Sequence, residues 1–244
     1  MILRMILIAV SFFLLGCEGS QSFALRSSLL GQFAKATANV TEKNNRYAIQ
    51  VDVHSTGIYN LVRGKRKEQY RSKGRIRKGL YYADHFAIEK WANGTHTLAE
   101  YLFDYRHRKI TRRFRSWKIK NGKLIQDVKD PMPYFGHDDF MTVLHNALYK
   151  QPGTKGKRKT FILAGADNSQ GKVPVYISGD DQLVVRQGGH AGGKLVQMQV
   201  HKGIFDGGKG SLTFVLDAQN NPERIIIKKV KIVGTVTGKP IHKK

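Results

Sequence analysis

Two glycine-rich segments have the spacing of a phosphate-binding loop. Gly188–Lys194 and Gly203–Lys209 each read glycine, four residues, glycine, lysine. A phosphate-binding loop continues with Ser or Thr, which binds magnesium, and then with a helix whose N-terminus faces the phosphates. Here Leu195 and Gly210 follow the lysines, and strand-like segments come next. We therefore interpret both segments as turns and expect no nucleotide cofactor.

The nine histidines offer little support for a metal site. No two of them stand four residues apart, the spacing with which a zinc-binding helix presents two ligands. His137, Asp138 and Asp139 form the densest cluster of metal-ligand types, and we interpret it as a helix start where the acids face the positive end of the dipole. The Gly-x-Ser-x-Gly elbow of the hydrolases is absent. The sequence thus predicts no metal, no cofactor, no catalytic residue and no enzymatic activity.

Residues 1–17 have the layout of a secretory signal peptide. Arg4 precedes an apolar run that ends at Leu14-Leu15-Gly16-Cys17. The run is too short for a transmembrane helix, which needs about 20 residues. Cys17 is the only cysteine of the chain, so no internal disulfide can form. An ordinary signal peptide cut nearby and a lipoprotein signal both fit, and each implies export.

The ending of this segment resembles the bacterial lipobox, in which a lipid is attached to the cysteine. The resemblance implies that Cys17 is acylated and anchors the chain to a membrane. Glu18 follows the cysteine, and it is not the Asp that commonly retains lipoproteins in the inner membrane. We expect a lipid-anchored protein in the periplasm or at the outer membrane.

Basic residues dominate the charge of the chain. It holds 42 Lys and Arg against 18 Asp and Glu, a formal net charge of +24. A charge of this size concerns partners and solubility rather than fold. We predict an anionic-surface site from two basic clusters, whose members are Arg63, Lys65, Arg66, Lys67, Arg106, Arg108, Arg112, Arg113 and Arg115.

The basic clusters allow three interpretations. Export favours a membrane, lipopolysaccharide or another anionic envelope component as the partner. A merely solvated face and a nucleic-acid-binding protein are the alternatives. The aromatics interleaved with the second cluster (Tyr105, Phe114 and Trp117) are typical of nucleic-acid-stacking sheets, but we expect them to fill one sheet face and the basic residues the other. If both clusters shared one face of neighbouring strands, their charges would repel.

Hydrophobic alternation divides the chain into three parts: the signal peptide 1–17, a tether or short helix over 18–45, and one β-rich domain over 46–244. Alternation predicts strands from Tyr47 to His54 and in many later segments, including 182–186. Asn121-Gly122 between two strand-like runs predicts a hairpin. Apolar residues at helical spacing predict one helix over 140–148, with Asp138 or Asp139 as its N-cap.

These elements predict a mainly β fold, with a curved antiparallel sheet or partial β-barrel and one central helix. The C-terminal segment 212–238 resembles the signature of domain-of-unknown-function family 3108, a set of exported bacterial envelope proteins. Asp138-Asp139-Phe140 resembles the central Asp-x-x-Ser segment of that family, with Thr142 where Ser is common, and the hairpin from Tyr105 to Phe114 fits as well. The resemblance implies a half-barrel like those of envelope lipoprotein carriers, with a concave face that can hold an acyl chain. We therefore expect a protein that binds an amphipathic ligand or an anionic surface, or that supports envelope assembly.

Overall fold

The structure is a computed structural model. It describes residues 19–57, 60, 64–150, 156–165, 170–200, 210–230 and 234–241. The predicted signal peptide, its Cys17, the predicted binding residue Arg63 and the glycine-rich segment 203–209 lie outside the described residues.

The described chain is mainly β, as predicted. Its strands are β1 (Gly19–Ser27), β2 (Gly31–Lys43), β3 (Arg46–Ser55), β4 (Lys67–Arg77), β5 (Leu80–Ala92), β6 (Thr95–Asp104), β7 (Lys109–Lys118), β8 (Leu124–Pro131), β9 (Asp138–Asp139), β10 (Lys157–Ala164), β11 (Lys172–Ser178), β12 (Lys194–Val200), β13 (Gly210–Leu216), β14 (Pro222–Val230) and β15 (Gly234–Pro240). Two short helices, α3 (Val143–Lys150) and α4 (Asp181–Arg186), complete it. In the described part of the chain, no helix is long and apolar enough to cross a membrane.

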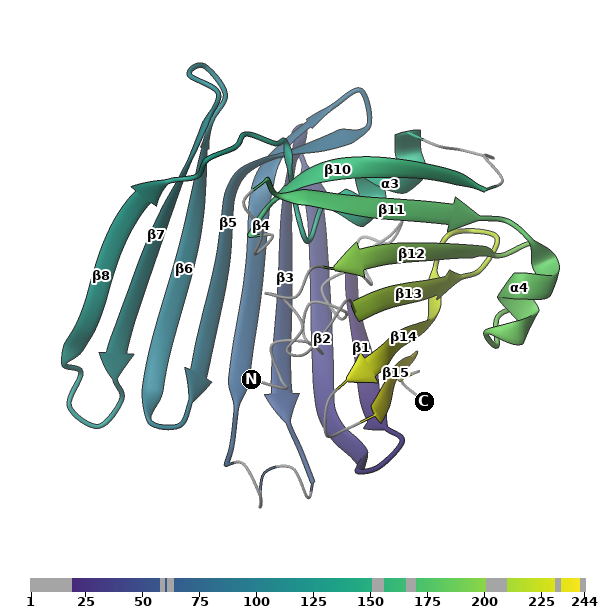
Figure 1. Cartoon of the computed structure of the whole chain (residues 1–244), viewed down its shortest axis with the longest axis horizontal. Coiled ribbons are helices and arrows are strands. Elements are labelled where there is room, and N and C mark those ends of the chain that lie inside the picture. Colours follow the sequence, from purple (N-terminus) through teal and green to yellow (C-terminus); the bar gives the residue numbers. More distant parts are fainter. Residues whose placement is uncertain are drawn as a thin grey trace.

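All the strands belong to one open sheet. Its order runs from β8 down to β1, then β15, and from there down to β9. Every neighbouring pair is antiparallel except the short β9–β10 pair, which is parallel. The sheet bends so that the tall arm β2–β8 faces the shorter arm β10–β15 (Figure 1). The predicted curved antiparallel sheet is confirmed.

The predicted tether or short helix over 18–45 is wrong, because this segment forms β1 and β2. Phe23 and Leu25 in β1 and Ala36, Ala38 and Val40 in β2 are buried in strand alternation. The alanines are too small to make that alternation obvious in the sequence. The turn between the strands is local: Ser27 Oγ accepts hydrogen bonds from two backbone N–H groups, and Gly31 has a φ of 65°.

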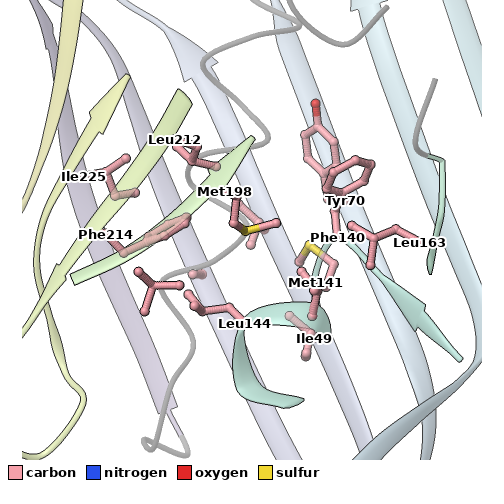
Figure 2. Packing of buried hydrophobic residues seen from close by; sticks show 14 of the residues in the cluster. Ile49, Tyr70, Phe140, Met141, Leu144, Leu163, Met198, Leu212, Phe214 and Ile225 are labelled. Atoms are coloured by element: carbon pink, nitrogen blue, oxygen red, sulfur yellow. The ribbon is translucent and has the colours of Figure 1, made fainter. Parts of the chain in front are cut away.

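The core lies between the two arms and is contributed by both. Tyr70 and Ile49 of the tall arm, Met198 and Phe214 of the shorter arm, and Leu144 of α3 point into it (Figure 2). Buried members of this cluster extend from Phe23 to Val236. Residues 18–244 therefore contain the side chains that hold the described fold together.

Both helices differ from the sequence prediction. The predicted 140–148 helix begins at Val143 instead, because residues 139–142 form a turn. In that turn Asp139 accepts hydrogen bonds from the backbone N–H groups of Met141 and Thr142. The predicted strand 182–186 is helix α4, since the carboxylate of Asp180 caps the backbone N–H groups of Gln182 and Leu183. The cap overrides the strand preference of the two valines that follow.

The segment between β8 and β10 crosses the interior from one sheet edge to the other. It covers the end of β5 that extends beyond β6. The Asn146 side chain accepts from the Tyr81 N–H and donates to the Tyr81 carbonyl, each at 2.8 Å. The Ala83 N–H donates to the His137 carbonyl at 3.3 Å, and the Tyr105 hydroxyl donates to the Ala83 carbonyl at 2.7 Å. These contacts satisfy buried backbone groups that have no neighbouring strand.

A buried polar chain fixes the same crossover to β4. Ser72 Oγ donates to Asp139 Oδ2 at 2.6 Å and lies 3.0 Å from the Tyr47 hydroxyl. Asp139 is fully buried, and this burial raises the pKa of its carboxyl to about 7, although its hydrogen bonds act in the opposite direction. Burial also raises the pKa of Tyr47 well above its ordinary value. These groups position the chain and face no solvent.

We expect the Asp139 carboxyl to make the free energy of unfolding depend on pH. Its folded pKa, about 7, lies above the ordinary value of 3.8, so between these values the folded state binds a proton that the unfolded state has lost. Unfolding free energy should therefore fall as pH rises from about 4 to about 7. In Asp139→Asn the amide replaces the protonated carboxyl and can donate to Ser72, so this component of the decline should vanish.

Urea denaturation of wild type and Asp139→Asn across this pH range measures the effect. The stability of the variant relative to wild type should increase with pH. The control for general charge effects is Asp181→Asn, which changes an exposed carboxylate whose hydrogen bond from the Gly192 N–H an amide oxygen can keep. Parallel stability curves for wild type and Asp139→Asn would contradict the raised pKa.

Candidate functional site

The structure divides the predicted anionic-surface residues between the two ends of the tall arm. We call the end with the β1–β2, β3–β4, β5–β6 and β7–β8 turns the lower rim; its described residues are 28–30, 56–57, 60, 64–66, 93–94 and 119–123, and it is at the bottom of Figure 1. Lys65, Arg66 and Lys67 lie there. Arg106 and Arg108 lie in the β6–β7 turn at the opposite end. The described members of the predicted set therefore do not all lie at one end of the sheet, because alternate turns of an antiparallel sheet point in opposite directions.

The remaining predicted residues, on β7, are ion-paired. Arg112 forms a bidentate pair with Asp130, and Arg113 forms one with Asp127 on the edge strand β8. Arg115 donates to Glu100 of β6 at 2.6 Å. The expected repulsion between the clusters is absent from β7: β5 and β6 separate it from β4, and carboxylates lie beside its arginines.

The expected separation of aromatic and basic side chains on β7 is also wrong. Arg112 and Phe114 share the face that carries buried Ile110, while Arg113, Arg115 and Trp117 share the opposite, outward face. Successive residues of a strand point to opposite faces of the sheet. Because both the arginines and the aromatic residues of β7 occupy odd and even positions, each type is distributed over both faces. Each face of β7 therefore carries one aromatic ring and at least one arginine.

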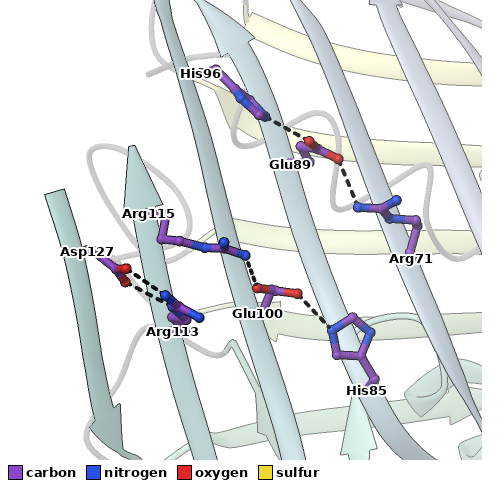
Figure 3. Close-up of polar contacts among 8 residues, drawn as sticks. All are labelled: Arg71, His85, Glu89, His96, Glu100, Arg113, Arg115 and Asp127. Carbon is purple, nitrogen blue, oxygen red and sulfur yellow. Dashed lines mark hydrogen bonds and ion pairs between the residues drawn. The ribbon is translucent and has the colours of Figure 1, made fainter. Parts of the chain in front are cut away.

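The outward face of the tall arm carries a network in which Glu89 and Glu100 each hold two partners, while Asp127 holds Arg113 (Figure 3). Glu89 accepts from Arg71 at 2.9 Å and contacts His96 at 2.8 Å. Glu100 accepts from Arg115 and lies 3.3 Å from His85 Nε2.

Burial opposes the charged form of both Glu100 and His85. For Glu100, the hydrogen bonds from Arg115 and His85 outweigh burial, and its pKa is lowered. For His85, burial outweighs the carboxylate, and its pKa is lowered too. A carboxylate held ionised by an arginine suits cross-strand stabilisation better than proton transfer.

A band of stacked side chains crosses the outward face at the lower rim. Lys67, Trp91, His96 and Trp117 stand directly opposite one another on β4, β5, β6 and β7. The Lys67 Nζ lies 4.9 Å from the Trp91 ring centre. The His96 ring stacks between the tryptophans, with centroid separations of 4.8 Å to Trp91 and 4.9 Å to Trp117. Stacking of this kind stabilises cross-strand pairs and covers the ring faces, leaving ring edges toward solvent.

A basic hollow lies beside this band. Its volume is about 480 Å³, and it opens between the β3–β4 connection and the β5–β6 turn. The three basic residues predicted at this end line it, with His54, Trp91, Asn93 and Ile119 among their neighbours. Ser55 Oγ accepts from the Arg66 N–H at 2.8 Å and so fixes the backbone beneath the basic side chains. The hollow therefore combines positive charge with an aromatic and an apolar wall.

The residues of the His137–Asp139 cluster, which are of metal-ligand types, make contacts that stabilise the fold. Asp138 contacts Asn146, Asp139 contacts Ser72, and the His137 ring packs on Tyr82, Tyr105 and Phe135. Among the described residues, no group of three His, Cys, Asp or Glu side chains is placed to hold a metal ion. The glycine-rich segment 188–194 is a turn that leads into strand β12, as predicted.

Sequence reasoning missed the role of Trp91, His96 and His54. They come from three separate strands, and none belongs to a motif. The signal that could have placed Trp91 and His96 is the hairpin pairing: Ala92-Asn93-Gly94 fixes the β5–β6 turn, residues 105–108 form the β6–β7 turn, and equal spacing from these two turns places Trp91 and Trp117 on either side of His96.

Comparison with known proteins supports the fold. No protein-family model matches the chain, and no curated protein does. A solved structure is similar: the crystal structure of a beta-barrel-like protein of domain of unknown function DUF1849 from Brucella abortus. The TM-score is 0.53 at 8% sequence identity, covering 91% of this chain and 94% of that one. At this identity the likeness shows a shared fold, and membership of family 3108 stays a prediction.

The ion pairs of β7 generate a prediction about stability. Replacing Arg112 and Arg113 with Gln should lower the melting temperature slightly, because two bidentate pairs are lost and no repulsion is relieved. The difference should shrink at high salt, since the pairs are exposed and screened. The matched variants replace Asp127 and Asp130 with Asn, alone and together with the arginines. A higher melting temperature for the arginine variant would contradict this pairing.

Proposed function

We propose that this chain is a non-enzymatic exported envelope protein, anchored by an acyl chain on Cys17, that binds an anionic amphipathic component of the envelope. The observation that carries the proposal is the basic hollow at the lower rim, where Lys65, Arg66 and Lys67 meet His54 and Trp91. Cationic side chains beside an aromatic ring and Ile119 suit a phosphate-bearing headgroup attached to an apolar body.

Two features support binding rather than catalysis. The interior groups whose pKa is most strongly raised are engaged in the fold: Asp139 and Tyr47 are buried and hydrogen-bonded to Ser72, and the Tyr105 hydroxyl donates to the Ala83 carbonyl. The carboxylates of the outward face are held by arginine and histidine. Neither group leaves an accessible nucleophile beside a base.

Nucleic acid is the alternative partner, and the stacked band argues against it. Bases bind single-stranded sites by stacking on open aromatic faces. The Trp91 ring has Lys67 on one side and His96 beside it, and Trp117 stacks on the other side of His96. Because these ring faces are covered, a ligand can contact the ring edges, which suits a lipid headgroup better than a stacked base.

Charge removal at the lower rim tests the binding proposal. Residues 18–244 with Lys65, Arg66 and Lys67 replaced by Gln should bind anionic vesicles about 100-fold more weakly than wild type, because each basic residue near such a surface contributes roughly 1 kcal/mol. The matched control replaces Arg77, Lys78 and Arg106 at the opposite end, also a loss of three charges, and should change binding far less. Equal losses would show that only overall charge matters. Tighter binding to single-stranded nucleic acid than to vesicles would favour the alternative.

The anchor is tested separately in cells. Cys17→Ser should abolish incorporation of labelled fatty acid and leave an unprocessed precursor in the membrane fraction. Normal processing and release of the variant would contradict lipidation while leaving the vesicle-binding result unaffected.

A further inference from the structure

We infer that the lower rim docks end-on onto an anionic lipid bilayer, with both tryptophans at the level of the headgroups. The inference rests on the proposed function and names its partner: a lipid surface, contacted by the turns and not by the flat outward face of the sheet.

Exposed apolar side chains gather at this end. Leu29 in the β1–β2 turn is 69% exposed, Ile119 in the β7–β8 turn 51%, and Leu124 and Ile125 at the start of β8 are 49% and 54%. They are four of the nine most exposed large apolar side chains in the described residues. A turn has no packing reason to present such residues to water, and apolar groups projecting from a rim are typical of membrane contact.

The charge of the rim complements an anionic bilayer. The segments 64–67, 91–97 and 117–126 contain no Asp or Glu. They contain six basic residues: Lys65, Arg66, Lys67, Lys118, Lys120 and Lys123. The acids that border these segments are paired with basic side chains: Asp127 with Arg113, Glu68 with Lys90, and Glu89 with Arg71 and His96. Long basic side chains around apolar tips let the tips enter the headgroup layer while the charges stay with the phosphates.

The stacked band places amphipathic rings just above these tips. Trp117 is followed directly by Lys118 and Ile119, and the Ile119 N–H donates to the Gly94 carbonyl at 2.8 Å, which joins the two turns. Trp91 and Trp117 are partly exposed and held rigidly by His96 between them. Tryptophan is enriched at the membrane–water interface because its ring is apolar and its N–H is polar.

The chain supplies its own reporter for this geometry, because Trp91 and Trp117 are its only two tryptophans. Residues 18–244 would be mixed with vesicles of phosphatidylglycerol and phosphatidylcholine, some carrying bromine on the acyl chains near the headgroups. We expect a blue shift of emission and quenching by the brominated lipid. Trp91→Phe and Trp117→Phe, each with one remaining tryptophan, should both be quenched.

Side-chain variants test the same contact without fluorescence. Leu29→Ser with Ile119→Ser should weaken vesicle binding at least tenfold. The matched control is Leu183→Ser with Val185→Ser on α4, where the side chains are 38% and 53% exposed but lie away from the rim; it should bind as wild type does. Circular dichroism confirms that each variant is folded, and serine at these exposed positions leaves the core intact.

The outcomes separate the two proposals. End-on docking would be overturned if vesicle binding required the basic hollow but the tryptophan fluorescence were not quenched and the Leu29→Ser, Ile119→Ser variant kept its vesicle affinity. The proposed function would then still stand. No binding to anionic vesicles would overturn both. The inference is supported if brominated lipid quenches the tryptophan fluorescence and if the Leu29 and Ile119 variant loses vesicle affinity while the Leu183 and Val185 control keeps it.

Discussion

The two edge strands of the sheet, β8 and β9, are consecutive in the chain, and the segment that joins them and continues into α3 packs side chains into the core between the arms. Such a passage carries backbone polar groups into an apolar core, where each unpaired group costs free energy. The crossover meets this constraint with side chains that stand in for a strand. The Asn146 amide pairs with both backbone groups of Tyr81, and Asp139 holds Ser72. The sheet curves around this crossover, whose elements α3 and β9 pack on β5 of the tall arm.

That curvature determines which surface is available for function. The core fills the space between the arms with side chains from both of them. The polar and aromatic groups of the tall arm that do not belong to this core, including Trp91 and Trp117, are displayed on its outward face and at its ends. On the outward face, carboxylates tie neighbouring strands together and use up much of the positive charge of β7. At the lower rim, the segments contributed by the turns contain lysine and arginine without acids, so positive charge persists there.

The sequence predicts the class of fold because alternation and turn chemistry are local. Asn121-Gly122 and the alternation of Tyr47–His54 were sufficient for their hairpin and strand. The sequence does not predict β1 and β2, because alanines weaken the contrast between apolar and polar positions. It does not predict α4 either, because the helix cap made by Asp180 outweighs the strand preference of two valines. Only part of the candidate site can be predicted from the sequence. Lys65–Lys67 stand out as a basic run, whereas Trp91, His96 and Trp117 are brought together only by strand pairing. Ion pairing of Arg112 and Arg113 depends on the β7–β8 register, which no local pattern contains.

The basic composition and the fold thus impose different requirements on the same residues. Like charges on neighbouring strands destabilise a sheet, so a chain with 42 Lys and Arg needs either carboxylates opposite them or positions beyond the last strand pair. Strands β6 to β8 use the first solution, with Glu100, Asp127 and Asp130 placed opposite arginines. The turns use the second, because a lysine in a turn extends into water and has no cross-strand neighbour. Positive charge therefore accumulates at the ends of the sheet, and at the lower rim it lies beside exposed apolar side chains and the two tryptophans.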